Sequence, residues 1–223
     1  HIPVGYLYCF GNPRVDWGFK TAPDPGLNGR SLQYPRGKVL GGCSSINGMI
    51  YMRGQARDYD QWRQLGNPGW SWDDVLPHFL KHEDQCAMEV GDLGRAHARG
   101  GEWRIEKPRI RWDILDAWAD AAAEAGIPRT KDFNGGDNEG SCYFQVNQRS
   151  GLRWNTAKAF LHPVRHRANL AVWTHTMVER LTLEGRRVSG LEVRREGQAA
   201  RVAVRREVVL AAGAIGSPQI LQL

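Results

Sequence analysis

The stretch GKVLGGCSSING, residues 37–48, places two adjacent glycines, three small side chains and then Ile-Asn-Gly after the proline-marked approach YPRGK. Side chains this small add little to a hydrophobic core, and glycine loses more backbone entropy on ordering than any other residue. The stretch therefore predicts a place where the backbone itself must be approached closely. Two explanations are open, a tight packing turn and a ligand held against main-chain amides.

Length and composition are those of a globular protein. The 223 residues are 41% hydrophobic and 24% charged, which predicts one large or two small domains. The net charge of +6 could indicate an anionic partner. The densest basic group, however, alternates with valine and polar residues, which is typical of the solvated face of a hairpin. That group is Arg194, Arg195, Arg201, Arg205 and Arg206. A basic nucleic-acid-binding module stays a disfavoured alternative, because neither aromatic platforms nor a recognition-helix motif stands out.

Metal and membrane chemistry have little support in the sequence. The four cysteines are far apart and form no CxxC pair: Cys9, Cys43, Cys86 and Cys142. We expect free thiols in the reducing cytoplasm and no metal site. His78 and His82 lie four residues apart but lack a third ligand, and DFNGGDNEG (132–140) does not have EF-hand spacing. No apolar run is long enough to span a bilayer, and the chain starts without a signal-peptide pattern.

The first half of the chain predicts a hairpin, helices and a long loop. Residues 19–23 and 31–35 flank Asn28-Gly29 and predict paired extended segments. Helices are expected over 46–52, over 72–83 and over 111–126. Ser71 and Asp74 begin the second of these, and Pro77 should bend or shorten it. Gly126 should end the third, whose Trp112 and Trp118 we expect in the core. Residues 84–109 are expected to form an irregular loop at a domain boundary.

The second half predicts a short helix over 155–161 and then a series of strands. The strands are expected over 169–175, 177–183, 187–193, 200–204 and 206–213. The last strand should lead through AAGAIGS into a helix with Ser217 as its N-cap and Pro218 at its first position.

Two segments therefore lead into helix starts through small residues, an arrangement that brings phosphates against backbone N–H groups. A dinucleotide site is one explanation. The other stays open, since GGCSS (41–45) is not GxGxxG, and AAGAIGS (211–217) could serve close packing of a helix on a sheet.

Longer motifs carry a resemblance. PRGKVLGGCSSINGMIYMRGQARDYDQW (35–62) resembles the amino-terminal signature of the glucose-methanol-choline family of flavin oxidoreductases, particularly its choline dehydrogenase-like members. VVLAAGAIGSPQILQL (208–223) resembles the start of that family's second signature, and the segments between follow in the family's order. The resemblance implies an α/β fold with α+β elements, an incomplete FAD-binding domain with part of an antiparallel substrate-side module. The FAD-binding parts would be 1–84 and 151–223, and the substrate-side or lid part 85–150.

The resemblance also implies FAD as cofactor and the oxidation of a small-molecule alcohol by hydride transfer to flavin N5. In the first signature, the positions that meet the diphosphate and flavin are taken by Gly41, Gly42, Ser45, Asn47, Gly48 and Met49. Val178 matches the position whose main chain meets adenine, and Ala212 and Gly213 match the turn beneath the nucleotide. Some relatives attach FAD through a histidine where this chain has Ile46, so non-covalent FAD is expected.

The family's GxGxxG strand and its carboxy-terminal catalytic histidine have no counterpart in this sequence. We therefore expect an internal fragment that is inactive alone, and we assign no catalytic residue. A non-redox lyase on the same flavin scaffold remains an alternative function.

Overall fold

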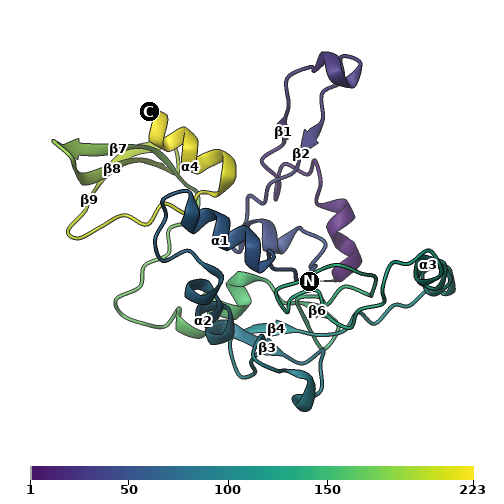
Figure 1. Cartoon of the computed structure of the whole chain (residues 1–223). Coiled ribbons are helices and arrows are strands. Elements are labelled where there is room, and N and C mark those ends of the chain that lie inside the picture. The colour runs from purple at the N-terminus through teal and green to yellow at the C-terminus, as the bar shows by residue number, and fades with distance from the viewer. Residues whose placement is uncertain (1) are drawn as a thin grey trace. The chain divides into compact units, whose positions relative to one another are not determined.

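The computed structural model describes residues 2–223, which form two compact units (Figure 1). The first unit extends to His166 and the second comprises Arg167–Leu223. Helices and strands occur in both units, as the expected mixed fold requires. Each unit is described separately below.

The predicted hairpin near the start of the chain is confirmed. Strand β1 (Phe19–Lys20) pairs antiparallel with β2 (Gln33–Tyr34). Asn28 and Gly29 in the connecting turn have φ of 56° and 73°, the left-handed conformation that asparagine and glycine tolerate best.

Two consecutive helices of the first unit, α1 (Ala56–Gln64) and α2 (Trp72–His82), pack against each other. The predicted capping box at α2 is confirmed: Ser71 Oγ accepts from the Asp74 N–H at 3.3 Å, and the Asp74 carboxylate accepts from the Ser71 N–H at 3.0 Å. The helix continues through Pro77 to His82.

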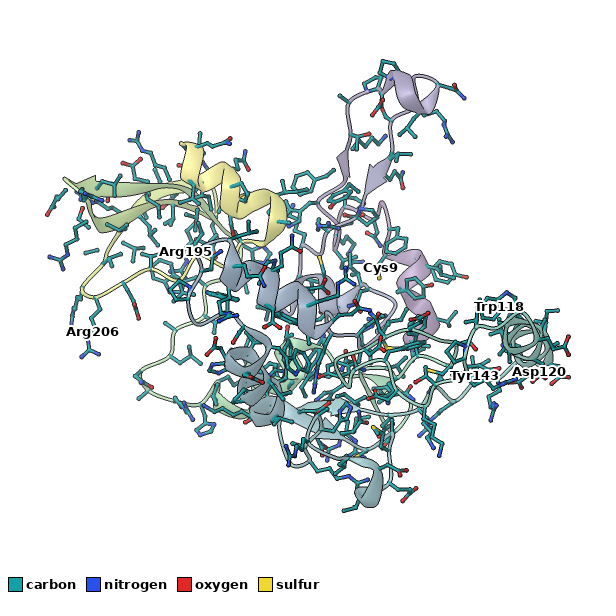
Figure 2. The ribbon with its side chains drawn as sticks, viewed as in Figure 1. Cys9, Trp118, Asp120, Tyr143, Arg195 and Arg206 are labelled. Atoms are coloured by element: carbon teal, nitrogen blue, oxygen red, sulfur yellow. The ribbon has the colours of Figure 1, made fainter. Side chains whose placement is uncertain are left out.

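Helix α3 (Asp113–Glu124) lies where it was predicted, and Gly126 follows it with a φ of 90°. The predicted burial of its tryptophans is wrong. Trp112 and Trp118 are 60% and 61% exposed (Trp118 is labelled in Figure 2), and the buried residues of the helix are Ala119 and Ala122. The helix stands at the edge of its unit, so its small side chains make the contact and its large apolar ones do not (Figure 1).

The segment predicted as an irregular loop over 84–109 contains strand structure. Strand β3 (Glu83–Gln85) pairs in parallel with β4 (Trp103–Ile105). Ile105 is fully buried and packs with Tyr51 and Ala87, with Trp103 against them. The prediction failed because a run rich in glycine and charge hides two three-residue strands whose partners are far apart in sequence.

The helix predicted over 46–52 is wrong. A 3₁₀ turn forms earlier, over Gly42–Ser45, and Met49 has a φ of 64°, which no right-handed helix allows. Beyond it the chain is extended: Ile50 bridges Val146, and the Tyr51 N–H donates to the Gln145 carbonyl at 2.9 Å. A distant strand-like partner thus overrides the local helix pattern.

The remaining elements of the first unit are short. They are the 3₁₀ turns η1 (Pro3–Tyr8), η2 (Pro25–Leu27), η3 (Gly42–Ser45), η4 (Val90–Asp92) and η6 (His162–Val164), the strands β5 (Gln148–Arg149) and β6 (Leu152–Arg153), and the π-helix η5 (Ala157–Leu161). Strands β5 and β6 form an antiparallel hairpin, and η5 corresponds to the helix predicted over 155–161.

The second unit is a three-stranded antiparallel sheet with one helix. Strands β7 (Thr176–Glu184), β8 (Arg187–Arg195) and β9 (Gln198–Ala203) pair in chain order, which confirms three predicted strands. The strands predicted over 169–175 and 206–213 do not form, because within residues 2–223 no ladder pairs with either segment.

Helix α4 (Gly213–Gln222) begins four residues before the predicted N-cap. Ser217 and Pro218 lie inside the helix, and Ser217 Oγ accepts from the Ala212 N–H at 3.0 Å. Ser217 therefore satisfies a donor just ahead of the first turn, although from within the helix.

Candidate functional site

The site is built on the glycine loop, residues 41–49, in the first unit. Gly41 and Gly42 have φ of 89° and 52°, a conformation that favours glycine. A Cβ on Gly41 would lie 2.7 Å from Ser45 Oγ, and one on the preceding Gly37 would lie 2.3 Å from the Gly42 carbonyl oxygen. Internal packing therefore accounts for the glycines at positions 37 and 41.

Gly48 has a different environment. Its φ lies outside the left-handed region, and a Cβ built on it would meet no heavy atom within 4 Å. Gly48 and the neighbouring Asn47 are exposed. Nothing within the described chain requires a glycine here, whereas a flat ligand approaching the backbone would. The open space beside Gly48 therefore fits a flat group such as the flavin nucleotide.

The two loop hydroxyls are held by the segment that follows β6. Ser44 Oγ donates to the Gly41 carbonyl at 2.5 Å and accepts from the Thr156 N–H at 3.0 Å. Ser45 Oγ donates to the Leu40 carbonyl and accepts from Asn155 Nδ2, both at 2.8 Å. The hydroxyls thus hold the loop in shape, and a contact from Ser45 to a ligand would come through its backbone.

Arg153 lies beneath the same loop and is 3% exposed. Its guanidinium donates to the Ser44 carbonyl at 3.1 Å and to Asn47 Oδ1 at 2.9 Å. Asn47 Oδ1 also accepts from the Met49 N–H at 3.0 Å. The Asn47 amide therefore connects a buried cation to the backbone at the end of the loop.

Two further loop residues turn inward. Ile46 is 3% exposed and Met49 is 8% exposed, so both side chains anchor the loop in the unit. The Met49 carbonyl accepts from the Asn147 N–H at 2.8 Å. Ile46 is aliphatic and offers no atom for a covalent link to a cofactor.

The other predicted cofactor residues lie in the second unit. Val178 is in β7, Ala212 is the N-cap of α4, and Gly213, with a φ of 81°, is its first residue. A helix start of this kind suits a phosphate. That these residues meet the same nucleotide as the glycine loop stays a prediction.

A buried charge cluster in the first unit was missed by the sequence reasoning. Glu83 Oε1 lies 2.9 Å from Arg53 Nη2 and 3.0 Å from His97 Nδ1, while His97 Nε2 lies 2.9 Å from Asp132 Oδ2. Burial lowers the pKa of His97, but the hydrogen bonds from Asp132 and Glu83 outweigh it and raise the pKa to about 9. Four separate segments supply these residues, so no local motif marks the cluster.

The cluster holds the chain just beyond the glycine loop, at residues 51–53. The Arg53 backbone N–H donates to Asn134 Oδ1 at 2.7 Å, and Asn134 Nδ2 donates to the Tyr51 carbonyl at 3.3 Å. With Arg53 and His97 both charged, the buried Glu83 and the partly buried Asp132 each have a cation beside them, as burial demands. Its function is to hold residues 51–53 against the 83–97 and 132–134 segments.

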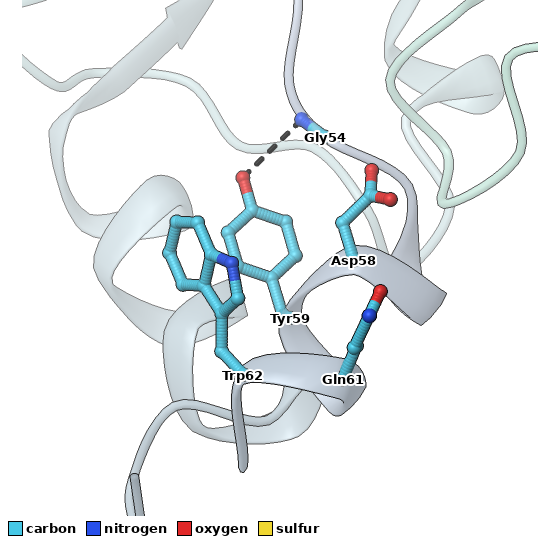
Figure 3. Close-up of a pocket in the computed structure, with 5 residues that line it drawn as sticks. All are labelled: Gly54, Asp58, Tyr59, Gln61 and Trp62. Carbon is cyan, nitrogen blue, oxygen red and sulfur yellow. Dashed lines mark hydrogen bonds between the residues drawn. The ribbon is translucent and has the colours of Figure 1, made fainter. Parts of the chain in front are cut away.

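A surface hollow of about 450 Å³ lies at the start of α1, lined by Gly54, Asp58, Tyr59, Gln61 and Trp62 (Figure 3). The Gly54 N–H donates to the Tyr59 hydroxyl at 3.2 Å across it. The hollow includes no residue of the glycine loop. Asp58 is engaged there in capping α1, where it accepts from the Gln55 N–H at 2.7 Å.

No cluster of three or more His, Cys, Asp or Glu residues within 2–223 could hold a metal ion, and the four cysteines are free thiols. None of the helices in this range combines the length and apolar character that crossing a bilayer requires.

Two arginines of the Arg-rich sheet pair with glutamates of the same sheet. Arg180 makes a two-pronged contact with Glu192 at 2.7 and 3.0 Å, and Arg194 contacts Glu179 at 2.7 Å. Arg195 lies over the Trp173 ring. The solvated face expected for Arg194, Arg195, Arg201, Arg205 and Arg206 is confirmed, since all five are exposed (Arg195 and Arg206 are labelled in Figure 2).

Comparisons with known proteins identify the family of the chain. Residues 6–223 match the family described as GMC oxidoreductase. The mitochondrial choline dehydrogenase of Mus musculus is 38% identical over 225 residues, and the oxygen-dependent choline dehydrogenase of Brucella anthropi is 40% identical over 222. Both matches cover 100% of this chain but 37% and 40% of the relative, so the chain spans about two fifths of their length.

A solved structure has the same fold over nearly the whole chain. The pyridoxine 4-oxidase from Mesorbium loti superposes with a TM-score of 0.90 and 35% sequence identity, over 98% of this chain and 42% of the oxidase. With the family match extending over nearly all of its residues, the chain belongs to the GMC oxidoreductase family.

Proposed function

We propose that this chain is part of an FAD-dependent oxidoreductase that oxidises the CH–OH group of a small alcohol. Family membership supports an oxidoreductase, and choline and pyridoxine in the names of the relatives suggest the class of substrate. The observation that carries the proposal is the glycine loop, whose Gly48 faces open space while its hydroxyls are occupied by protein.

FAD, when bound, would supply the hydride acceptor. Gly41, Gly42, Gly48 and the backbone of Ser45, Asn47 and Met49 would hold it in the first unit. Val178, Ala212 and Gly213 would serve its adenosine and phosphate side in the second. Binding is proposed to be non-covalent, because Ile46 is a buried aliphatic residue.

The chain's own residues contribute shape and position. The hydrogen bonds of Thr156 to Ser44 and to the Gly41 carbonyl fix the conformation of the glycine loop. The space beside Gly48 therefore stays open, and no side chain has to move when a flat ring approaches. Preorganised backbone of this kind costs no reorganisation during reaction. No histidine of the chain is assigned as the base.

The proposal is tested with the full-length natural protein. FAD titration followed by flavin fluorescence should show saturable binding. Under anaerobic conditions, choline, pyridoxine and simple alcohols should then be screened for bleaching of the bound flavin. Substrate-dependent bleaching supports the oxidoreductase. FAD binding with no bleaching by any alcohol, together with turnover of a cyanohydrin, would favour the non-redox lyase instead.

The isolated 223 residues are a second test. We propose that they bind FAD weakly and turn over no alcohol. Tight stoichiometric binding with turnover by this chain alone would contradict that part of the proposal. The electron acceptor is found by comparing reoxidation of the bleached flavin by oxygen and by a soluble quinone.

A further inference from the structure

Arg153 is a buried cation without a carboxylate partner. Within residues 2–223, the ion pairs formed at 4.0 Å or less do not include it. Its hydrogen-bond acceptors are neutral: the Ser44 carbonyl at 3.1 Å, Asn47 Oδ1 at 2.9 Å and the Pro3 carbonyl at 3.4 Å. A buried charge ordinarily has an opposite charge beside it, because its desolvation is otherwise costly.

A second cation adds to the positive charge beside the loop. Lys158 Nζ donates to the Arg153 carbonyl at 2.7 Å and likewise takes part in no ion pair of the described residues. The contrast with the charge cluster of the same unit is clear, since there Arg53 and His97 meet Glu83 and Asp132. Burial lowers the pKa of Arg153, yet a guanidinium keeps its charge in proteins.

Arg153 also controls the conformation of the glycine loop. Two of the three acceptors of Arg153 belong to residues 41–49, and one of them, Asn47 Oδ1, holds the Met49 N–H as well. Removing the guanidinium would free the Asn47 side chain and the Ser44 carbonyl together. The loop's shape next to Gly48 therefore depends on a residue more than a hundred positions later in the chain.

We propose that Arg153 is a positioning residue for the flavin nucleotide: it sets the conformation of the glycine loop through Ser44 and Asn47, and its unpaired charge favours an anionic group bound there. The inference rests on the proposed function, and it adds a residue that lies outside both signature segments. Anionic character is common to the diphosphate and to reduced flavin, so affinity and reduction potential should both respond.

The test uses the full-length protein with FAD and the variants Arg153→Met, Arg153→Lys and Asn47→Asp. Arg149→Met is the matched control, because Arg149 is an exposed arginine on β5 of the same hairpin. Arg153→Met should weaken FAD binding about tenfold or more, since it removes charge-assisted hydrogen bonds. Arg149→Met should change the dissociation constant less than about twofold.

The midpoint potential of the bound flavin distinguishes a positioning and charge effect of Arg153 from a simple loss of folding, because it is measured on protein that still binds FAD. It should become more negative in Arg153→Met, stay near the wild-type value in Arg153→Lys, and be unmoved in Arg149→Met. Asn47→Asp keeps an acceptor for Arg153 and supplies the opposite charge that Arg153 lacks, so this variant should melt at or above the wild-type temperature and still have a lowered potential. It carries the test if Arg153→Met does not fold.

The outcomes are distinguishable. Wild-type affinity and potential in Arg153→Met, or in Asn47→Asp where Arg153→Met does not fold, would overturn the inference while leaving the proposed function in place. Wild-type protein that binds no FAD would contradict the proposed function and the inference with it.

Discussion

His97 and Glu83 are joined by a hydrogen bond of 3.0 Å between Nδ1 and Oε1, and both side chains are withdrawn from solvent. The other ring nitrogen of His97 reaches Asp132 at 2.9 Å. The ring therefore lies between two carboxylates, which stabilise its protonated form.

This arrangement predicts a pH dependence of stability. The pKa of His97 is raised from 6.5 to about 9 in the folded protein. A raised pKa means that the folded state binds the proton more tightly, so the contribution is fully present below pH 6.5 and is lost as pH rises through 9. Its size is on the order of 3 kcal/mol. Urea unfolding from pH 6 to 10 should show the free energy of unfolding fall across this range.

The variant His97→Gln should remove most of that slope, because glutamine does not titrate. His78→Gln is the control, since His78 is exposed on α2. An equal slope in wild type and His97→Gln would show that other groups cause the pH dependence.

Gly37 and Gly48 should respond differently to alanine. A Cβ on Gly37 would lie 2.3 Å from the Gly42 carbonyl oxygen, a backbone atom, so Gly37→Ala should lower the free energy of unfolding by about 1–3 kcal/mol. A Cβ on Gly48 meets nothing within 4 Å, so Gly48→Ala should change stability by less than about 0.5 kcal/mol. Thermal unfolding without ligand measures both.

The same pair tests the ligand site. Gly48→Ala should weaken FAD binding although it leaves the fold intact, because its methyl group enters the space proposed for the cofactor. Unchanged FAD affinity in a normally folded Gly48→Ala would place the cofactor elsewhere.

The clamp between Ser44 and Thr156 should appear as a coupling energy. Ser44 Oγ accepts from the Thr156 N–H at 3.0 Å and lies 3.0 Å from Thr156 Oγ1. Ser44→Ala leaves the Thr156 N–H without this acceptor and should cost about 1–3 kcal/mol. A double-mutant cycle with Thr156→Val should give an interaction of about 0.5 kcal/mol or more. Additive single effects would mean that the two hydroxyls act independently.

Cys43 should be the first thiol to react with iodoacetamide. It is exposed, whereas burial raises the pKa of Cys86 and raises that of Cys142 to about 11. Since the thiolate is the nucleophile, these two should be labelled slowly at pH 8. Peptide mass spectrometry with and without FAD reports the site.

Bound FAD should slow the labelling of Cys43, because Cys43 lies within the glycine loop. The rate at Cys86, outside the loop, is the internal control. Equal rates at Cys43 in the presence and absence of saturating FAD would argue against cofactor contact at the loop.

Local interactions explain which elements were predictable. The capping box of Ser71 and Asp74 and the Asn28-Gly29 turn each act within a few residues, and both formed as expected. Strands β7, β8 and β9 are neighbours in sequence joined by tight turns, so their alternation was sufficient to place them. In the helix over 46–52, by contrast, the local pattern was overridden by pairing with residues 145–146.

Burial was less predictable than element type. The apolar stripe of α3 was correctly assigned to a helix, but the side that contacts the rest of the unit holds Ala119 and Ala122. Periodicity shows that a helix has an apolar face, whereas contact with that face depends on where neighbouring segments lie. Trp118 is exposed for this reason.

The sequence by itself determined the family, through its long signature segments. It also determined that a glycine loop exists, because glycine and small side chains act on the backbone at their own positions. The tertiary structure alone decided that Arg153 and Thr156 hold that loop and that Arg53, Glu83, His97 and Asp132 form one buried cluster. Hydrogen bonds and ion pairs between distant segments depend on distances in space, and these become fixed when the chain packs.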